Sequence, residues 1–332
     1  MKPIVGITMG DAAGIGPELI LKAFKNGGLR GICRPLVIGS LAAMEFYRER
    51  LNIGLEFRAI DDPAAAEFEA GVLDILDLGL VDVASLKIGV VQAGPGKAAV
   101  VYTQKAGNMA MAGTIDAIVS APLNKEAMRK AGYSFEGQTQ ILAELTGSKR
   151  FGMILLLGSI RVMMLTNHMA LRAACDAVSK ERVFEMITLA DESLRGFGIE
   201  RPKIAVAGLN PHSGEGGLFG REEIEGSIPA IEAASANGID VTGPVPADVV
   251  FVKAREGGYD LVLAMYHDQA NMAAKLLGFG EVVTLLAGLP IIRTSVGHGT
   301  AFDIAGKGIA DHTNFVRAIE TAAELAGIKK EK

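Results

Sequence analysis

The sequence predicts an α/β protein whose largely parallel sheet is covered by helices. Short apolar runs rich in Val, Ile and Leu recur along the chain without polar alternation, as in strands that are buried on both faces. Longer stretches with apolar residues at helical spacing lie between these runs and end in glycine. This alternation is typical of parallel strands that are connected by helices.

Seven apolar runs are expected to form strands. In chain order they are residues 3–8, 35–40, 117–122, 152–157, 161–166, 203–208 and 261–266. Residues 96–113 and 179–198 are expected to form helices, because their apolar residues repeat every three to four positions. With 332 residues, of which 49% are hydrophobic, the chain is near the length at which one core becomes two domains.

Composition argues against several classes of protein. The net charge of −5 and the scattered Lys and Arg residues do not favour a nucleic-acid partner. No apolar run approaches the roughly 18 residues of a membrane span, and the N-terminal residues fit a first strand better than a signal peptide. Cys33 and Cys175 lie in unlike contexts, so neither a disulfide framework nor a thiolate metal site is indicated. We therefore expect a cytoplasmic protein.

Three of the five histidines follow apolar runs: His168, His212 and His267. Ligands of open α/β sheets collect at the carboxyl ends of strands, so these side chains are expected at the mouth of a sheet. Three neutral imidazoles suit a divalent transition metal such as zinc and leave coordination positions open for substrate oxygens. Asp268 and Asn210 could orient two of the rings.

A second interpretation of the histidines stays open. Each could be a strand-end residue that is hydrogen-bonded locally. The separations, 44 residues from His168 to His212 and 55 from His212 to His267, match no local metal motif such as H-E-x-x-H.

The first apolar run leads into MGDAAGIGPE, residues 9–18. Asp11 is expected in a turn there, and Gly14, Gly16 and Pro17 would open a helix whose N-terminal amides could face an anion. The pattern is neither the dinucleotide G-x-G-x-x-G fingerprint nor a phosphate loop. A helix start that merely needs small residues explains it equally well.

Eight segments carry a resemblance to a known family. In chain order they are MGDAAGIGPE, APLNKEAM, LTNHMALR, GLNPHSGEGGLFGREE, PADVVF, AMYHDQ, KLLGFG and GLPIIRTSVGHGTAFDIAGKGIAD. The chain is similar to the 4-hydroxythreonine-4-phosphate dehydrogenase (PdxA) family, including its relatives that act on 4-phosphothreonate. The resemblance runs from Pro3 to about Ala326, in order and at the family's spacing.

The resemblance implies a fold like that of isocitrate and isopropylmalate dehydrogenases, with two interleaved α/β/α domains and an active-site cleft between them. We expect residues 1–135 and about 300–332 to form the first domain. Residues from about 136 to 299 would form the second, with most metal and dimer contacts. The resemblance also implies an obligate homodimer.

The implied chemistry is oxidation of a secondary alcohol next to a carboxylate, commonly with decarboxylation of the 3-oxo acid. NAD or NADP and one divalent metal ion per site (Zn, Co, Mg, Mn or Ni) are the implied cofactors. His168 and His212 match two metal ligands of one subunit, and His267 matches the ligand from the other subunit. One ion could serve both steps, because it would acidify the alcohol and then stabilise the enolate left by loss of carbon dioxide.

The remaining functional positions also come from the resemblance. It implies Lys275 and Asp248 as catalytic residues, with Asp248 as a polar support or proton relay. The implied substrate-binding residues are Gln138, Thr139, Lys275, Thr284 and Arg293. The implied cofactor-binding residues are Asp11, Gly14, Asn210, Glu215 and His298. Ordinary surface charges at Lys275 and Arg293, a cap or turn at Asp248, and a local backbone contact at His298 remain alternatives.

Three departures from the family pattern concern the substrate pocket. The family's Gly-His-Thr-Glu is replaced at 137–140 by Gly, Gln, Thr and Gln, so that a substrate-contacting histidine becomes the uncharged Gln138. A family Asn falls at Thr284, and the Asp of Asp-His-Gly-Thr is replaced by Gly297. Lys275 and Arg293 are kept, and two cations could bind either a phosphate or a carboxylate.

The favoured function is a metal- and NAD-dependent dehydrogenase of a 4-phosphorylated hydroxy acid, of the 4-hydroxythreonine 4-phosphate or 4-phosphothreonate type. The alternative is the same chemistry on an unphosphorylated acid such as a carboxylated cis-dihydrodiol of the terephthalate type. A non-catalytic metabolite-binding protein is disfavoured, because sensing would not require a Lewis acid with open coordination positions.

Overall fold

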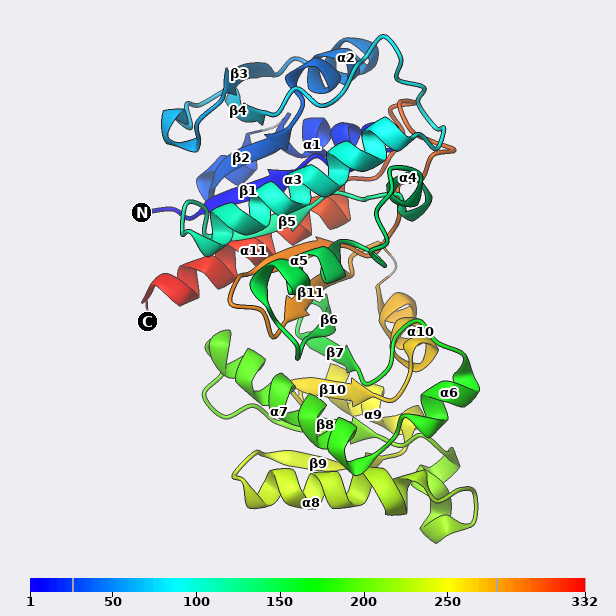
Figure 1. The fold of residues 1–332 in the computed structure, drawn as a ribbon. Coiled ribbons are helices and arrows are strands. Elements are labelled where there is room, and N and C mark those ends of the chain that lie inside the picture. The colour runs from blue at the N-terminus through cyan, green and yellow to red at the C-terminus, as the bar shows by residue number, and fades with distance from the viewer. Residues whose placement is uncertain (26, 279, 332) are drawn as a thin grey trace. The chain divides into compact units, whose positions relative to one another are not determined.

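The computed structural model describes residues 1–25, 27–278 and 280–331, so Phe279 of the KLLGFG motif lies outside the described residues. The chain folds into two compact α/β units (Figure 1). The first contains Met1–Lys149 and Leu289–Lys332, and the second contains Arg150–Gly288. The α/β class predicted from the sequence is confirmed in both units.

The unit boundaries fall elsewhere than the expected 135/136 and 299/300. Helix α5 (Gln138–Thr146) belongs to the first unit because it packs against α3 (Ala93–Met111). Strand β12 (Arg293–Val296) also belongs to the first unit, because it extends the sheet as a parallel neighbour of β5 (Ala117–Ser120).

The first unit contains a sheet whose neighbouring strands are parallel. The strand order is β3 (Glu56–Ile60), β4 (Val72–Asp77), β2 (Arg34–Gly39), β1 (Ile4–Thr8), β5 and β12. Its helices are α1 (Gly16–Phe24), α2 (Leu41–Leu51), α3, α4 (Lys125–Lys130), α5 and α11 (Thr313–Glu331). Helix α3 packs on β1, β2 and β5, whereas α11 packs mainly on β12 and β5. The sheet strands β1, β2 and β5 are almost fully buried, as their continuous apolar runs predict.

The second unit has a mixed sheet. The strand order is β11 (Val283–Ala287), β6 (Gly152–Leu157), β7 (Ile160–Met164), β10 (Leu261–Ala264), β8 (Ile204–Ala207) and β9 (Val241–Val245). Strand β6 is antiparallel to both of its neighbours, β11 and β7. From β7 to β9 the strands are parallel, so their carboxyl ends meet at one edge.

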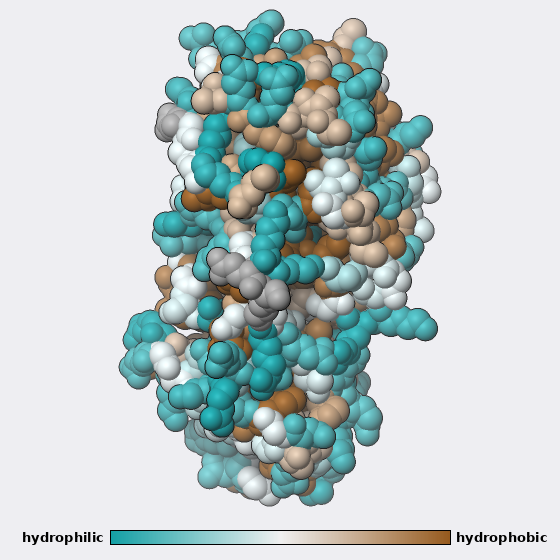
Figure 2. Space-filling view, turned by 90° about the vertical axis from the view of Figure 1, so that its left-hand side faces the viewer, coloured by the Kyte–Doolittle hydropathy of each residue, from teal (hydrophilic) through white to brown (hydrophobic). Residues whose placement is uncertain are grey.

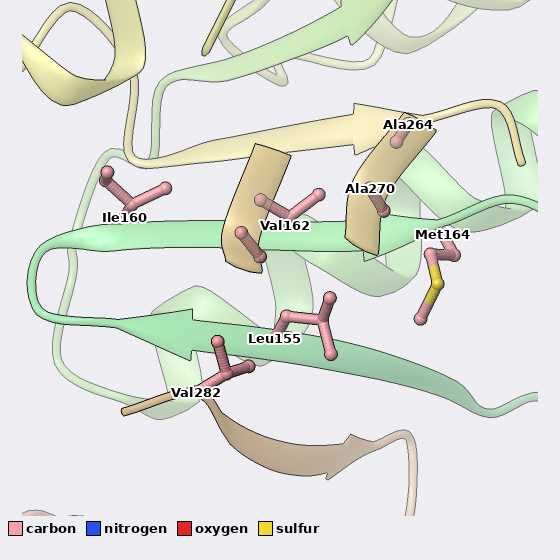
Figure 3. Close-up of a cluster of buried hydrophobic side chains, with 8 residues drawn as sticks. Leu155, Ile160, Val162, Met164, Ala264, Ala270 and Val282 are labelled. Atoms are coloured by element: carbon pink, nitrogen blue, oxygen red, sulfur yellow. The ribbon is translucent and has the colours of Figure 1, made fainter. Parts of the chain in front are cut away.

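The helices of the second unit place its functional candidates. They are α6 (Leu171–Asp176), α7 (Lys180–Gly196), α8 (Ile228–Ala236), α9 (Ala247–Arg255) and α10 (His267–Leu277). Helix α10 packs through Ala270 and Ala274 into a core that Val162 and Leu155 of the sheet help to form (Figure 3). Small residues at both helix positions let α10 approach the sheet closely, and this packing fixes its first residue, His267.

The surface is mostly polar on the face drawn in Figure 2, where hydrophilic side chains surround smaller hydrophobic areas. Within the described residues, no helix combines the length and apolar composition that a membrane crossing requires.

The close packing of α10 can be tested with Ala270→Leu. Ala270 has no exposed surface, so the added methylenes must displace the neighbouring side chains. We expect the free energy of unfolding to fall by about 1–3 kcal/mol in urea titrations. Ala236→Leu places the same side chain at an exposed position of α8 and should change that value by less than about 0.5 kcal/mol. Equal effects of the two substitutions would contradict the packing described for α10.

Candidate functional site

The three histidines follow the three adjacent strands β7, β10 and β8. His168 lies beyond the end of β7, His267 beyond β10 and His212 beyond β8. Because these strands are parallel, the three chain segments leave the sheet at the same edge. The sheet topology therefore brings together chain segments that are 44 and 55 residues apart in sequence.

Two polar side chains tie the three strand ends to one another. Thr166, beyond β7, donates from Oγ1 to the carbonyl of Met265 at 2.8 Å. Gln269 accepts from the Met265 amide at 2.7 Å and donates to the carbonyl of Gly208, beyond β8, at 2.9 Å. The two contacts orient the Gln269 amide uniquely, because its oxygen must face an N–H and its nitrogen a carbonyl. Sequence reasoning missed both residues.

His168 and His267 are neighbours within one chain. Their ring centroids lie 5.4 Å apart, with the ring planes tilted by 40°. The Nδ1 atom of His267 lies 2.8 Å from Oδ1 of Asp268. A carboxylate at Nδ1 favours the tautomer that leaves Nε2 free to bind a metal, so this pair matches a common arrangement of metal-ligating histidines.

Within the described residues, no group of three or more His, Cys, Asp or Glu side chains is placed to hold one metal ion. The resemblance pairs His168 with His212 in one subunit, whereas the ring contact within the chain joins His168 to His267. The Nδ1 atom of His212 lies 2.9 Å from Oε2 of Glu215, and Nε2 of His212 takes no part in that contact.

The backbone around His212 is left-handed over consecutive residues. The φ angles of His212, Ser213 and Glu215 are 51°, 56° and 45°. Left-handed backbone costs a non-glycine residue roughly 1–2 kcal/mol, so the rest of the protein must hold this turn. Ser213 contributes by donating to the carbonyl of Pro244 at 3.2 Å. Gly214 has a φ of 81° and lies against Glu223, where a Cβ atom would be 2.8 Å from Oε2.

A buried carboxylate anchors the start of this turn. Glu223 is 1% exposed and accepts from the Asn210 amide at 2.7 Å and from Asn210 Nδ2 at 2.9 Å. Asn210 Nδ2 also lies 2.7 Å from Glu222. The pKa of Glu222 is lowered, first by hydrogen bonding to its own backbone and then by the Asn210 side chain. The side-chain Nδ2 of Asn210 therefore donates to two carboxylates of the protein itself. The sequence did not point to Glu222 or Glu223.

Arg293 is a buried cation in the first unit. It is 6% exposed, and its Nε donates to Ser120 Oγ at 3.1 Å while Nη2 donates to Gln138 Oε1 at 2.9 Å. No carboxylate in the described chain lies within ion-pair distance of its guanidinium. Burial lowers the pKa of Arg293 to about 10. Keeping the charge there costs roughly 3 kcal/mol, which an acidic ligand would offset.

Gln138 is held as firmly as the arginine that it contacts. Its Nε2 donates to the Ala121 carbonyl at 2.9 Å, so its oxygen must face Arg293. It is the first residue of α5, and Thr139 follows it in the first helical turn. Two predicted substrate residues, Gln138 and Arg293, are therefore in direct contact. Ser120, at the end of β5, was missed, although polar residues at strand ends are a general signal of a site.

The other predicted catalytic and substrate residues lie in the second unit. Thr284 is 7% exposed on β11, opposite Leu155 in the strand register. Lys275 is exposed in the last turn of α10. Asp248 is exposed in the first turn of α9, where no side chain caps the helix.

The turn that begins α1 is packed inside the first unit. A Cβ atom on Gly16 would lie 2.2 Å from the carbonyl oxygen of Met9, and one on Gly14 would lie 2.9 Å from that of Thr300. The amide of Ile15 already donates to the Thr300 carbonyl at 3.1 Å. This packing supports the interpretation that small residues are needed here for space.

Asp11 lies within this turn and has no exposed surface. Its Oδ1 accepts from the Ala13 amide at 2.9 Å, whereas Oδ2 is buried and has no hydrogen-bond partner among the residues that the structure describes. Burial raises the pKa of Asp11 to about 6. His298, by contrast, is exposed, and its Nδ1 lies 3.0 Å from the carbonyl oxygen of Gly299.

Comparison with known proteins identifies the family. The family described as "Pyridoxal phosphate biosynthetic protein PdxA" matches residues 31–322. The chain belongs to the PdxA family. It is 46% identical over 325 residues to a D-threonate 4-phosphate dehydrogenase of Cupriavidus necator, covering 98% of this chain and 97% of that protein. It is 47% identical over 328 residues to a protein of the same name from Pectobacterium atrosepticum, covering 98% and 100% of the two chains.

Solved structures of two dehydrogenases are similar to this chain. A 4-hydroxythreonine-4-phosphate dehydrogenase from Klebsiella pneumoniae superposes with a TM-score of 0.91 at 43% identity, covering 98% of this chain and 99% of that one. A terephthalate 1,2-cis-dihydrodiol dehydrogenase from Burkholderia xenovorans gives a TM-score of 0.66 at 28% identity, covering 96% and 98%. The chain is accordingly an oxidoreductase of the PdxA type that acts on a CH–OH group.

The buried carboxyl of Asp11 makes stability depend on pH. Its pKa is about 6 in the folded protein and near 4 in an unfolded chain, so the folded state retains a proton that the unfolded state has lost between these values. This contribution to stability is therefore lost as pH rises from about 4 to about 6, by up to about 3 kcal/mol. We expect Asp11→Asn to gain stability over wild type through that interval, as measured by urea unfolding at successive pH values.

The matched control for Asp11→Asn is Asp82→Asn. Asp82 accepts from the amide two residues ahead, as Asp11 does, but it is exposed. Its substitution should leave the pH dependence of unfolding at the wild-type value. If the curves of wild type and Asp11→Asn ran parallel between pH 4 and 7, Asp11 would not hold the proton that we assign to it.

Proposed function

We propose that the chain is a metal- and NAD-dependent dehydrogenase that oxidises the secondary alcohol of a 4-phosphorylated hydroxy acid, with decarboxylation of the resulting 3-oxo acid. The observation that carries the proposal is the burial of Arg293, which is 6% exposed. Within the described residues its side chain donates hydrogen bonds to two neutral partners, Ser120 and Gln138. Such a cation is suited to an acidic group of a ligand. The relatives at 46% and 47% identity are named for a phosphorylated acid, which favours phosphate over a second carboxylate.

The substrate contacts that we propose in the first unit are Arg293, Gln138 and Thr139. Arg293 supplies the charge, and Gln138 keeps its guanidinium in one orientation by accepting at 2.9 Å. In the second unit we propose Lys275 and Thr284 as further substrate contacts. Because Gln138 stays uncharged, the proposed pocket has no histidine charge that varies near neutral pH.

We propose that His168, His212 and His267 hold the metal ion. The donor set fits a divalent transition metal, because the Nδ1 atoms of His212 and His267 each lie within 2.9 Å of a carboxylate oxygen and leave Nε2 available. A bound ion would polarise the alcohol and carboxylate oxygens of the substrate. Zinc, cobalt, nickel, manganese and magnesium all remain candidates.

The proton-transfer and charge-binding roles are proposed for two exposed side chains. Oxidation of the alcohol releases a proton from its oxygen, and Asp248 would relay that proton to solvent. Lys275 would hold negative charge on the substrate and provide electrostatic support as carbon dioxide leaves. Both side chains are solvent-accessible, so each is free to reach a bound ligand.

The proposed NAD contacts are Asn210, Glu215 and His298, with Asp11 and Gly14 in support. His298 and Glu215 are exposed, whereas Asp11 has no exposed surface. The part that we propose for Asp11 and Gly14 is to hold the turn before α1. NADP is the alternative cofactor.

We further propose a homodimer that shares its active sites. Several large apolar side chains of the second unit are exposed, among them Leu276 at 85%, Leu218 at 72%, Met272 at 63% and Leu171 at 60%. They follow the same strands as the metal-site histidines, and exposed apolar patches commonly mark protein interfaces. A second copy covering this surface would supply the third histidine. The cytoplasmic location expected from the sequence stays a prediction.

The substrate class is tested by NAD reduction with metal-reconstituted protein. We expect turnover of 4-phospho-D-threonate or 4-hydroxy-L-threonine 4-phosphate, because Arg293 provides an uncompensated charge for phosphate. A carboxylated cis-dihydrodiol is offered in parallel. Turnover of the dihydrodiol alone would overturn the phosphorylated substrate and establish the alternative acid on the same fold.

The shared metal site is tested with His212→Ala and by dilution. We expect His212→Ala to lose bound metal and to lower kcat/KM at least about 100-fold, because one ligand of three is removed. His312→Ala, at a histidine outside the proposed metal set, should retain both properties. Metal content and activity should also decline together as the dimer is diluted to monomer. A monomer that retained full activity would refute the shared site.

A further inference from the structure

Lys125 lies beside the residues that surround Arg293. It is the first residue of α4, and Asn124 before it caps that helix by accepting from the Ala127 amide at 2.8 Å. A Cβ atom on Gly137 would lie 3.7 Å from Lys125 Cε. Gly137 directly precedes Gln138, which accepts from Arg293. The Lys125 side chain therefore extends to the start of α5, next to the partner of the buried guanidinium.

The charge of Lys125 has no counter-ion in the described part of the chain. Glu126, the next residue, pairs with Lys130 at 3.2 Å, and Asp116 pairs with Lys330 at 2.7 Å. Glu136 is exposed and makes no ion pair among the described residues. A cation in the first turn of a helix is also disfavoured by the helix dipole. Lys130, in the last turn of the same helix, has an ion-pair partner and lies at the end of the helix where the dipole favours a cation. Local structure thus explains Lys130 but gives no reason for a cation at Lys125.

The N-terminus of α5 adds partial positive charge beside Lys125 and Arg293. This helix has nine residues, and no side chain caps its first turn. Its first amides have no partner within the helix, so they favour a negative group. Lys125 lies against Gly137 on one side, and Arg293 reaches Gln138 from a buried position. Two cations that have no carboxylate partner in the described ranges therefore adjoin one uncapped helix start.

We propose that Lys125 is a further substrate-binding residue, which contacts the same phosphate group of the substrate as Arg293. This inference rests on the proposed function, because it assigns Lys125 to the acid-binding part of that site. Arg293 is buried and held by two hydrogen bonds, whereas Lys125 is exposed on a long side chain. Lys125 would therefore close on the phosphate after Arg293 has oriented it, and it would stabilise substrate binding more than the chemical step.

The test compares Lys125→Met with Lys130→Met in the full-length, metal-loaded protein. Both substitutions remove one positive charge from α4, but only Lys125 adjoins Gly137. With 4-phospho-D-threonate as substrate, we expect Lys125→Met to raise KM about 10-fold with kcat changed less than about 2-fold. Lys125→Arg, which keeps the charge, should recover most of the loss. Lys130→Met should match wild type.

Inorganic phosphate provides a second readout that does not depend on turnover. Calorimetric titration should show phosphate binding about 10-fold more weakly to Lys125→Met than to wild type or Lys130→Met. Equal phosphate affinities in all three proteins, or no phosphate binding by wild type, would overturn the role of Lys125. If wild type bound phosphate through Lys125 but turned over no phosphorylated acid, the proposed function would fail while the assignment of Lys125 as an anion-binding residue stood.

Discussion

The parallel arrangement of β7, β10 and β8 is the constraint on which the candidate metal site depends. It sends three chain segments out of one edge of the sheet, and Thr166 and Gln269 lock those segments together through backbone groups. His168 and His267 owe their adjacency to this lock. The packing of α10 through Ala270 then determines the position of His267, the first residue of that helix. The candidate metal site, whose residues are far apart in sequence, thus depends on hydrogen bonds between two side chains and the backbone.

The first unit contributes a buried cation, Arg293, to the proposed site. It buries Arg293 among neutral partners, so the cost of desolvating a cation is not offset within the described chain. Gln138 and Ser120 fix the guanidinium without neutralising it. A carboxylate at either position would stabilise the protein and remove the charge from use. In the function that we propose, the unit gives up some stability to keep one cation available to an acidic ligand.

The sequence predicted the buried strands well, because β1, β2, β5, β8 and β10 are continuous apolar runs. It did not predict β3, of which only Ile60 is buried, or β9, which contains Gly243 and Pro244. β12 begins with Arg293 and reads as polar, although all of its residues are buried. β4 carries Asp74, which interrupts its apolar pattern. β11 was missed as well, although only Thr284 interrupts its buried apolar run. The other missed strands are defined by tertiary contacts that composition does not reveal.

Among site residues, the histidines were predictable because strand ends are visible in a sequence. The supporting contacts were not. Glu223 and Asn210 are 13 residues apart, and Ser120 and Arg293 are 173 apart, so neither pair has a local signal. The left-handed turn at His212 is suggested only by its glycines, while His212 and Glu215 share the same backbone conformation. The sequence shows that Gln138 departs from the family pattern, but only the structure shows that it accepts a hydrogen bond from Arg293.

We propose that Arg293 of this PdxA-family protein binds a phosphate of the substrate. The most direct measurement is calorimetric titration of the metal-loaded protein with 4-phospho-D-threonate and, separately, with D-threonate. We predict that the phosphorylated acid binds at least about 100-fold more tightly, and that Arg293→Met abolishes most of this difference. Equal affinities for the two acids in the wild-type protein would contradict the account.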